Sequence, residues 1–399
     1  MEYSTYNQIS DFKSKLGEAP LFVCDMDGNI MSGYSLPEGA EPNVSLFPGG
    51  IKPGNQDIPF TYLPEELDYF VPNQQILRGI FAGNTMDVRI PKKLVDIINE
   101  SNANGQPFRL ALLTSRKIEE AIQILKASGV KEPEKVTLVG DSGATIQING
   151  ELKNARPLSK QEQGVKESIE TVVNSAGFVD GMNEIMATYL DEFEPPYIEV
   201  KNIAVNVHYR KVVEQLEAAG REDDASSLDK ALSTYVNETL ESIVEGTSFE
   251  LRTGAMTVET IIKDTNKGHG LEAIVQAAVD GGHQPSEVIF SGDDICNYKN
   301  GGYGTGTDYY AMAAAPVLQR QFGIPFLNTH THHPENEKSP YPRPKHESDP
   351  SNLPVEFPAP KVDLRLPYPW HNAQMISEVL NPKQPKPEIV VGHGAYDVP

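Results

Sequence analysis

Cysteine and long apolar segments are scarce in this sequence. Cys24 and Cys296 are the only cysteines among 399 residues, too few for a disulfide framework, and we interpret both as reduced thiols buried at strand ends. No apolar run approaches the roughly 20 residues that a membrane-spanning helix needs. Residues 1–15 are polar and lack the apolar segment of a signal peptide. These absences predict a soluble, cytoplasmic protein.

Basic residues are also few. The chain has 34 Lys and Arg against 56 Asp and Glu, a formal net charge of −22. Such a charge repels nucleic acid and anionic membrane surfaces, so we expect neither as a partner. It also repels anionic substrates at long range. A phosphate site in this chain therefore requires local help from a metal ion, lysines and backbone N–H groups.

The order of the expected elements predicts an α/β core. The length of 399 residues allows about two or three compact units. An apolar run at 20–24 ends abruptly in acidic residues, as buried parallel strands do at their carboxyl ends. Further strands are expected at 108–113, 135–139 and 288–290, and helices at 91–101, 118–128 and 268–280. This alternation is typical of a doubly wound, Rossmann-like parallel sheet.

A second, smaller unit interrupts this pattern. After residue 141 an Asn-Gly turn within 144–152 predicts a hairpin. A helix at 161–175, a strand at 204–209 and an interrupted helix over 211–245 follow, which indicates an inserted α+β module. We therefore divide the chain into a first core part at 1–150, a module at 151–254, a second core part at 255–334 and a tail at 335–399.

Other segments are predicted to lack regular structure. Residues 31–84 are rich in Gly, Pro and Asn, which indicates a long irregular insertion over the core. The glycines of 301–308 indicate a flexible loop. Proline is so dense beyond residue 335 that we expect an extended or partly disordered tail, without a normal helix or central strand. His330 and the two histidines that follow it can suit zinc, but we interpret them as a loop near the active-site face.

Acidic residues follow the first strand directly. Asp25, at the strand end, can attack phosphorus and form an aspartyl-phosphate. Asp27 can donate a proton to the leaving oxygen and later activate water, and Gly28 lets the backbone approach a phosphate closely. Acids and glycine also form calcium loops. An EF-hand loop that starts at Asp25 needs Gly and Glu where this chain has Ile30 and Leu36, so that alternative fails.

A second cluster stands at the end of the strand expected at 108–113. Thr114 and Ser115 offer hydroxyls that can bind a phosphoryl oxygen, and Arg116 beside them is a candidate for substrate contact. The alternative for Thr114 is a helix cap, and its hydroxyl can serve both purposes.

Two further clusters carry charge. Lys267, at the start of an expected helix, can offset the negative charge of a phosphate and of Asp25, or else be a solvated surface lysine. Asp293 and Asp294, at the end of a strand, suit a hard cation such as Mg²⁺, or else cap a helix. All four clusters follow strands or begin helices of the same expected sheet, and this shared placement favours catalysis over the separate alternatives.

These clusters carry a resemblance to a known family. The series Asp25-Met26-Asp27-Gly28, Thr114, Lys267 and Gly292-Asp293-Asp294 resembles the four motifs of the haloacid dehalogenase superfamily, with the module placed like its larger cap. The resemblance implies that Asp25 is the nucleophile and Asp27 the general acid and base. It further implies that Thr114 and Lys267 bind phosphate.

The same resemblance implies a metal site. Asp293 would bind Mg²⁺ beside Asp25 and the backbone carbonyl of Asp27. Asp294 would be a supporting acid at that site. Asn29 departs from the superfamily, which usually has Thr or Val there.

The module narrows the resemblance. Tyr197-Ile198-Glu199-Val200-Lys201 and Val207-His208-Tyr209-Arg210 look like the cap strands of trehalose-6-phosphate phosphatases, and Asn266-Lys267-Gly268 is similar to their third motif. The resemblance implies that Glu199 and Lys201 contact sugar hydroxyls, and the alternation of a strand puts both on one face. The alternative is an exposed cross-strand ion pair. His208 and Arg210 share the polar face of the neighbouring strand, and we add them as candidate substrate contacts.

One departure from the phosphatases stands out. Asn297 occupies a position where they usually have a further Asp after the acidic pair. The expected function is nevertheless Mg²⁺-dependent hydrolysis of trehalose 6-phosphate. The alternatives are another sugar-phosphate phosphatase or phosphosugar mutase, and a non-catalytic sugar-phosphate sensor, which Asn29, Asn297 and the long extra segments would suit.

Overall fold

The core of the protein is an eight-stranded sheet. The computed structural model describes residues 2–27, 29–30, 32–34, 44–45, 52–53, 77–81, 84–254, 256–299, 302–331, 353, 355, 357–366 and 369–380. The strand order is β10-β9-β8-β7-β1-β15-β18-β19. The strands are β1 (Leu21–Cys24), β7 (Leu110–Leu113), β8 (Leu138–Gly140), β9 (Thr145–Ile148), β10 (Glu151–Asn154), β15 (Val288–Gly292), β18 (Phe326–Thr331) and β19 (Leu364–Leu366). Neighbours from β8 to β19 pair in parallel, and β9 and β10 add an antiparallel edge.

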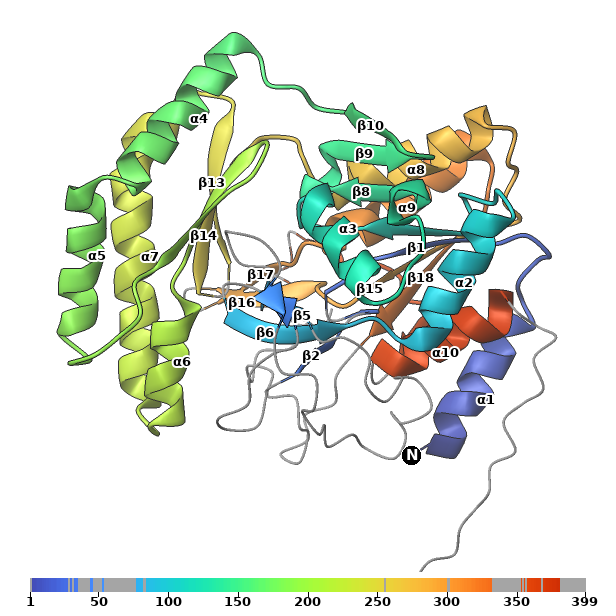
Figure 1. Cartoon of the computed structure of the whole chain (residues 1–399), viewed down its shortest axis with the longest axis horizontal. Coiled ribbons are helices and arrows are strands. Elements are labelled where there is room, and N and C mark those ends of the chain that lie inside the picture. Colours follow the sequence, from blue (N-terminus) through green and yellow to red (C-terminus); the bar gives the residue numbers. More distant parts are fainter. Residues whose placement is uncertain are drawn as a thin grey trace, which may run out of the picture.

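Helices cover both faces of this sheet, as Figure 1 shows. In β1, Phe22 and Cys24 pack into one layer while Leu21 and Val23 pack into the other, and all four are fully buried. One layer holds α1 (Glu2–Lys13), α2 (Lys92–Ala103), α3 (Ile118–Ala127) and α10 (Pro369–Leu380), and the other holds α8 (Lys267–Asp280) and α9 (Tyr309–Phe322). Burial on both faces explains the uninterrupted apolar run of β1. The predicted doubly wound α/β fold is confirmed.

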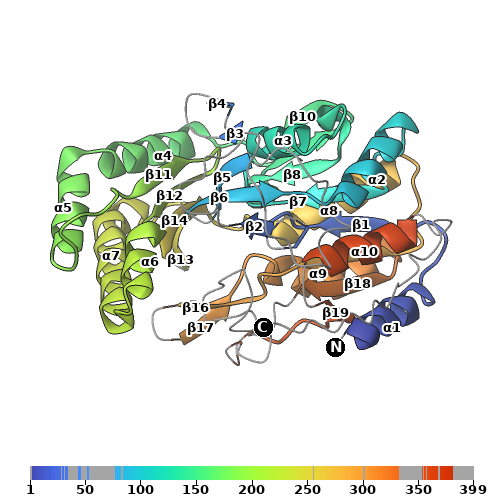
Figure 2. The ribbon, with the colours of Figure 1, turned by 60° about the horizontal axis from the view of Figure 1, so that its bottom comes forward.

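The inserted module has its own sheet and its own apolar core. Its strand order is β11-β12-β14-β13, all antiparallel. The strands are β11 (Tyr197–Val200), β12 (Ala204–His208), β13 (Phe249–Gly254) and β14 (Thr257–Ile262), and α4 (Lys160–Val173), α5 (Ala176–Ala187), α6 (Arg210–Ala218) and α7 (Glu222–Val244) pack on one face (Figure 2). Gly220, with φ of +70°, separates α6 from α7, close to the expected interruption.

The observed sheets divide the chain differently from the expected boundaries. Strand β14 continues the module sheet to Ile262, beyond the boundary drawn at residue 254. Strand β10 pairs with β9 in the core sheet, although it begins at the residue where the module was expected to start. The strand at 257–262 was missed because its alternation is short and lies next to the helix that restarts the core pattern.

The prediction of an irregular segment at 31–84 is wrong where the structure describes it. A five-stranded sheet has the order β2-β6-β5-β3-β4. Its strands are β2 (Ser32–Tyr34), β3 (Val44–Ser45), β4 (Lys52–Pro53), β5 (Leu77–Phe81) and β6 (Asn84–Arg89). The longest pair, β5 and β6, is antiparallel and separated by two residues, the length of the commonest hairpin connection. The Gly and Pro content of the whole segment concealed this local signal.

The prediction of a tail without a normal helix is also wrong, and the tail adds an edge strand to the core sheet. Strand β19 pairs in parallel with β18, and helix α10 packs in the apolar layer that contains β1. Within α10, Ala373, Met375 and Ile376 are fully buried. The prolines lie on either side of this segment, and Pro369 stands at the first helical position, where a missing N–H costs nothing. Averaging over the whole tail hid a stretch that can form a helix.

Histidine 371 in α10 makes stability dependent on pH. Burial lowers the pKa of His371 to about 4 from its ordinary value of 6.5. The unfolded chain therefore takes up the proton first, and stability, complete above pH ~6.5, falls as the pH drops toward about 4. We expect this group to remove about 2 kcal/mol between pH 7 and pH 5. Urea unfolding of His371→Gln at both pH values should show that much less pH dependence than wild type.

The control for this prediction is His269, which is exposed on α8. His269→Gln should keep the wild-type dependence on pH. An unchanged pH dependence in His371→Gln would contradict the assignment.

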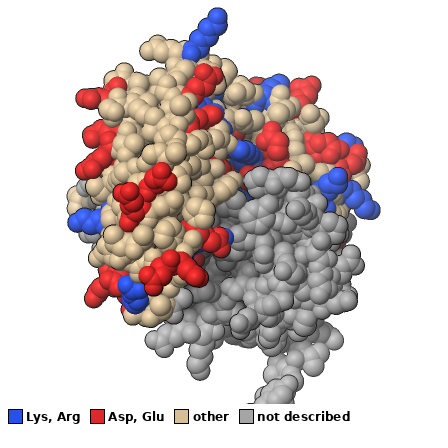
Figure 3. All heavy atoms as spheres, turned by 60° about the vertical axis from the view of Figure 1, so that its left-hand side comes forward, with Lys and Arg blue, Asp and Glu red and all other residues tan. Residues whose placement is uncertain are grey.

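The two cysteines are buried and the module carries many acidic side chains, as the sequence predicts. Cys24 and Cys296 are both buried thiols, and burial, followed by the charge of Asp25, raises the pKa of Cys24. Figure 3 shows acidic side chains spread over the face of the module that carries its helices, where Glu222 and Asp223 are exposed. Among the described residues, no helix combines the length and the apolar character that crossing a membrane requires.

Candidate active site

Asp25 stands at the carboxyl end of β1, in the middle of the core sheet. Its backbone N–H donates to the carbonyl of Ser291 in β15 at 2.8 Å. Its side-chain Oδ1 lies 2.8 Å from Nζ of Lys267, the first residue of α8. The two side chains are 5% and 2% exposed, so Lys267 is not the solvated lysine of the alternative interpretation.

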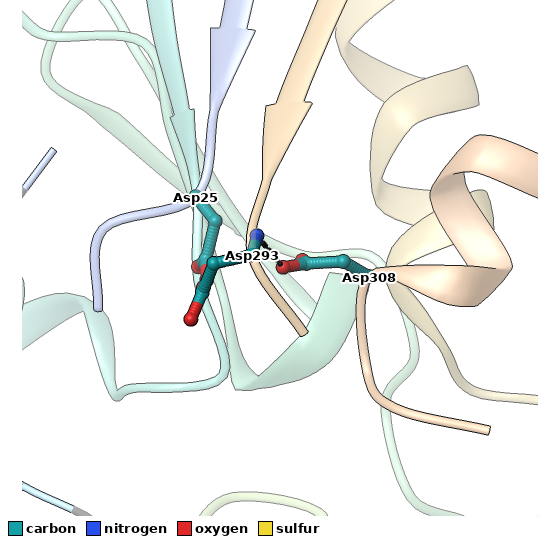
Figure 4. A group of neighbouring side chains, drawn as sticks. All are labelled: Asp25, Asp293 and Asp308. Carbon is teal, nitrogen blue, oxygen red and sulfur yellow. Dashed lines mark hydrogen bonds between the residues drawn. The ribbon is translucent and has the colours of Figure 1, made fainter. Parts of the chain in front are cut away.

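Three carboxylates meet at this edge of the sheet. Asp25, Asp293 and Asp308 each offer a carboxylate oxygen, and these oxygens lie within 4.8 Å of one another. All three residues are buried, with Asp308 fully so. Figure 4 shows the carboxylates of Asp25 and Asp293 side by side and Asp308 reaching in from the start of α9. The parallel pairing of β1 with β15 brings the first two together, because their carboxyl ends lie at the same edge.

Asp308 was missed at the level of the sequence. Its Oδ1 accepts a hydrogen bond from Lys267 Nζ at 2.7 Å. Its Oδ2 accepts from the backbone N–H groups of Asp293 and Asp294, at 2.8 and 2.9 Å. Asp308 therefore ties Lys267 to the turn that carries Asp293. The glycine-rich segment predicted as a flexible loop instead contains β17 (Gly302–Thr305), paired with β16 (Cys296–Lys299), and ends in this buried acid.

Asp294 lies at the same turn but is not one of the three acids that meet. Its Oδ2 accepts from the N–H of Thr307 at 2.7 Å and holds the loop that leads to Asp308, which agrees with the expected supporting role and leaves its role as a metal ligand a prediction. Position 297 is Asn, and the further carboxylate beside Asp293 comes from Asp308. The β16–β17 hairpin separates it from the acidic pair in the sequence, while the Asp294 carbonyl accepts from the Asp308 N–H at 2.9 Å.

The acidic group carries unbalanced charge. Burial, followed by the charge of Asp308, raises the pKa of Asp25 well above its ordinary value, and Lys267 offsets only part of this. Burial lowers the pKa of Lys267, but Asp25 and Asp308 outweigh burial and raise it, so its ammonium stays charged. If all three carboxylates were ionised, the single ammonium would leave a surplus of two negative charges, from three minus one.

This donor set fits a divalent cation. Both oxygens of Asp308 are occupied, by Lys267 and by two backbone N–H groups, so Asp25 and Asp293 are the carboxylates oriented to hold an ion. Mg²⁺ prefers oxygen ligands, and the buried carboxylates of Asp25 and Asp293 provide them.

The predicted phosphate-binding hydroxyls lie on the adjacent strand. Thr114 follows β7, is fully buried, and its Oγ1 accepts from the N–H of Arg116 at 3.1 Å. Ser115 Oγ accepts from the hydroxyl of Ser142 at 3.1 Å. Since β7 is the other neighbour of β1, these residues stand beside Asp25 at the same edge of the sheet. Gly28 lies outside the described residues.

Asp27 is held by an arginine. Both carboxylate oxygens of Asp27 accept from Nε of Arg116 at 2.9 Å, and Oδ1 also accepts from Nη2 at 2.7 Å. Burial lowers the pKa of Arg116, but the charge of Asp27 outweighs burial and raises it. The pair joins the loop after β1 to the loop after β7. For Asp27 to donate a proton to a leaving oxygen, this pair has to open.

The predicted contacts on the module form one polar group. Glu199 Oε2 lies 3.1 Å from His208 Nε2, 3.2 Å from Asn206 Nδ2 and 3.6 Å from Lys201 Nζ. Burial alone would raise the pKa of Glu199, but Lys201 and His208 hold it well below its usual range. Lys201 also lies 3.8 Å from Glu259 of β14, a residue that sequence analysis missed together with its strand. These side chains are largely buried, so the exposed ion pair of the alternative interpretation does not apply.

This polar group faces the core site. Lys201 Nζ donates to the carbonyl of Ser115 at 3.1 Å, across the boundary between module and core. Asn202 Nδ2 donates to Oδ2 of Asp141 at 2.7 Å, a second contact across the same boundary. The module sheet therefore turns its polar face toward the loop that carries the predicted phosphate-binding hydroxyls, and its apolar face toward α4 to α7.

Arg210 does not share this position. Strand β12 ends at His208, and Arg210 begins helix α6, so the strand alternation on which its prediction rested does not reach it. Its Nη1 lies 3.5 Å from Glu214 on the same helix, and its charge acts on Asp229 of α7. The structure thus places Arg210 on the helical side of the module.

Comparison with known proteins gives distant similarities. No family model matches the chain, and no curated protein matches it. Among solved structures, a trehalose-6-phosphate phosphatase of Aspergillus fumigatus is 14% identical, with 94% of this chain and 97% of that chain covered and a TM-score of 0.42. The C-terminal domain of a C. albicans trehalose-6-phosphate phosphatase is 11% identical, with 94% and 96% covered and a TM-score of 0.44.

A third similar structure is a trehalose-6-phosphate phosphatase related protein. It is 15% identical, with 90% of this chain and 96% of that chain covered and a TM-score of 0.41. Identities at this level give no equivalence between individual residues, so the chemistry of the site has to follow from its own side chains.

Proposed function

We propose that the protein is a phosphatase that hydrolyses phosphate monoesters through an aspartyl-phosphate on Asp25. The observation that carries the proposal is the buried pairing of Asp25 with Lys267 beside Asp293 and Asp308. The Asp25 carboxylate can attack phosphorus as a nucleophile, and the buried Lys267 ammonium at 2.8 Å can stabilise the negative charge of an incoming phosphoryl group.

The proposed reaction has two steps. Oδ of Asp25 forms a bond to phosphorus while the bond from phosphorus to the substrate oxygen breaks, and Asp27 gives its proton to that leaving oxygen. Water then attacks phosphorus and passes a proton to Asp27, which releases inorganic phosphate and restores the Asp25 carboxylate. Arg116 opposes the first step while it holds Asp27 in the observed ion pair. Substrate entry that draws Arg116 toward the phosphate would free Asp27.

The second proposed component is Mg²⁺. Asp25 and Asp293 would hold the ion, with the Asp27 carbonyl as a further ligand by the motif resemblance. The ion would supply positive charge to the phosphoryl group. An ion that binds the folded state but not the unfolded chain raises the melting temperature of the protein. We expect saturating Mg²⁺ to raise it for wild type by a thermal-shift assay, and Asp293→Asn to lose that shift. Retention of the full shift by the variant would place the ion elsewhere.

We propose a sugar phosphate, with trehalose 6-phosphate as the first choice, as the substrate. Glu199, Lys201 and His208 offer charged donors and acceptors opposite the phosphate-binding loop, which suits a sugar rich in hydroxyl groups. The module at about 151–254, extended to β14, would act as a cap that excludes water. Asn297 was one of the features that motivated the sensor hypothesis, and the buried carboxylate of Asp308 beside Asp293 favours the enzyme.

Steady-state release of phosphate tests the proposal. Trehalose 6-phosphate, other sugar phosphates and an aryl phosphate are compared at saturating Mg²⁺. Preference for trehalose 6-phosphate supports the first choice, and preference for another sugar phosphate supports the alternative phosphatase. A mutase would convert one phosphosugar into another without releasing phosphate. Binding without turnover of any of them would reject the proposal.

Glu199→Gln tests the role of the module. Its carboxylate is replaced by an amide of equal size, and a charge-assisted hydrogen bond to the sugar is worth about 1.5–3 kcal/mol. We expect kcat/KM for the sugar phosphate to fall roughly 10- to 100-fold, while hydrolysis of the aryl phosphate is unaffected. Glu170→Gln, which removes the partner of Lys166 on α4, is the control and should leave both substrates unaffected. Equal losses on both substrates would contradict a role in sugar recognition.

A further inference from the structure

Asn29 lies below the active site and joins two strands. It is fully buried, and its Nδ2 donates to two backbone carbonyls, that of Asp25 at 3.1 Å and that of Ser291 at 2.8 Å. These carbonyls belong to the carboxyl ends of β1 and β15, the strands that deliver Asp25 and Asp293. Both N–H groups of the amide are therefore used to connect the two strand ends.

The oxygen of the same amide receives donors from separate elements. Asn29 Oδ1 accepts from the hydroxyl of Ser291 in β15 at 2.9 Å and from the hydroxyl of Thr331 in β18 at 2.8 Å. It also accepts from Nδ2 of Asn372 in α10 at 2.9 Å. Three donors on one side and two carbonyls on the other leave a single orientation for the amide.

Helix α10 reaches this point with a fully buried side chain. Asn372 Nδ2 donates to the backbone carbonyl of Asn29 at 3.2 Å as well as to its Oδ1. Beside it, His330 Nε2 lies 3.1 Å from the carbonyl of Asp293 and donates to it. His330 of β18 therefore holds the backbone at Asp293, and Asn372 of α10 holds the backbone at Asn29.

From these contacts we infer that the C-terminal segment is part of the catalytic apparatus, with Asn372 as a positioning residue that acts through Asn29 on the spacing of Asp25 and Asp293. The inference rests on the proposed phosphatase function. It joins two features that the motif resemblance left unexplained, the asparagine at position 29 and the additional helix α10. A buried acceptor at position 29 requires buried donors, and Asn372 supplies one of the three, the one that comes from α10.

Asn372 is expected to affect the position of the Asp25 carboxylate and not the binding of the substrate. Asn372 contacts the backbone behind the nucleophile and lies on the opposite side of β1 from the lysine that would face phosphate. A displacement of about 1 Å at a reacting group can lower a rate about 100-fold. Loss of Asn372 should therefore lower kcat and leave KM unchanged.

The test compares two buried asparagines. Asn372→Ala removes one donor to Asn29, whereas Asn328→Ala removes another buried amide, which donates to the carbonyls of Lys361 in the same C-terminal segment and of Met312 in α9. Both variants lose a buried hydrogen bond and some stability. We expect Asn372→Ala to lower kcat about 10- to 100-fold at constant KM, and Asn328→Ala to leave kcat unchanged at a temperature where both are folded.

Hydrogen exchange provides a readout that does not need activity. Backbone amides of the 21–30 peptide should exchange faster in Asn372→Ala than in Asn328→Ala. Thr331→Val removes another donor to the same oxygen without changing the helix, and should act in the same direction if Asn372→Ala does not fold. Unchanged exchange together with unchanged kcat in both site variants, or equal kcat losses in the Asn328 control, would overturn the inference. A wild type that releases no phosphate would reject the proposed function, while the exchange result would still decide the positioning role.

Discussion

Asp25→Asn is expected to reduce phosphate release ~10⁴-fold or more, as removal of a catalytic nucleophile does in other enzymes. The folded protein should be at least as stable as wild type. Burial and the charges of Asp308 and Asp293 raise the pKa of Asp25, so its ionised form is disfavoured in the folded state. An amide of the same size removes this electrostatic cost, and Lys267 keeps Asp308 as its partner.

The dependence of this effect on pH has a definite sign. A carboxyl group with a raised pKa in the folded state binds its proton more tightly there than in the unfolded chain. Its contribution to stability is therefore complete below the unfolded value of about 3.8 and is lost as the pH rises toward the folded value. Relative to Asp25→Asn, wild type should lose stability with rising pH, measured by urea unfolding between pH 4 and pH 8.

Asp180→Asn, on the exposed surface of α5, is the matched control and should retain both activity and stability. Substantial turnover by Asp25→Asn would reject the covalent mechanism. A marked loss of stability would contradict the charge balance inferred for the site.

Asp308→Asn is expected to lower activity and stability together. The substitution places an amide N–H either against the Lys267 ammonium or against the N–H groups of the Asp293 turn. Breaking a buried ion pair in this way costs about 3–5 kcal/mol. Because the turn that carries Asp293 loses its anchor, kcat should fall about 100-fold.

Urea unfolding and initial rates measure both effects. The Asp25→Asn variant serves as the comparison. It makes the same chemical change at the other carboxylate that pairs with Lys267, and its stability should be unchanged or higher. Wild-type stability in Asp308→Asn would mean that the Lys267 pair does not hold the site together.

The sequence allows the parallel core and part of the site to be predicted, for a common physical reason. Strands buried on both faces must be apolar until they end, so the acids after β1 and β15 mark the strand ends directly. Parallel pairing then brings Asp25 and Asp293 to one edge, and the helix that begins with Lys267 brings the ammonium.

Other parts of the site could not be predicted from local patterns. Asp308 is separated from its hydrogen-bonding partners by a hairpin, so its role depends on a pairing between distant residues. Arg210 was misplaced because strand alternation was extended past the last residue of β12. Helix α10 was missed because the prolines around it dominated the composition of the segment. Asn372 gave no signal at all, since its significance lies only in the side chain that it contacts.

The position of β1 in the sheet also bears on how the protein folds. On one edge of β1, Leu21 pairs with Val288 of β15, and the other edge of β1 pairs with β7. Half of the backbone partners of β1 therefore come from a distant part of the chain. All strands and helices of the inserted module lie between those two partners in the sequence. Contacts within the module close shorter loops, and closing longer ones costs more conformational entropy. We therefore expect the module to acquire its structure on the ribosome before β1, the strand that precedes Asp25, pairs with β15.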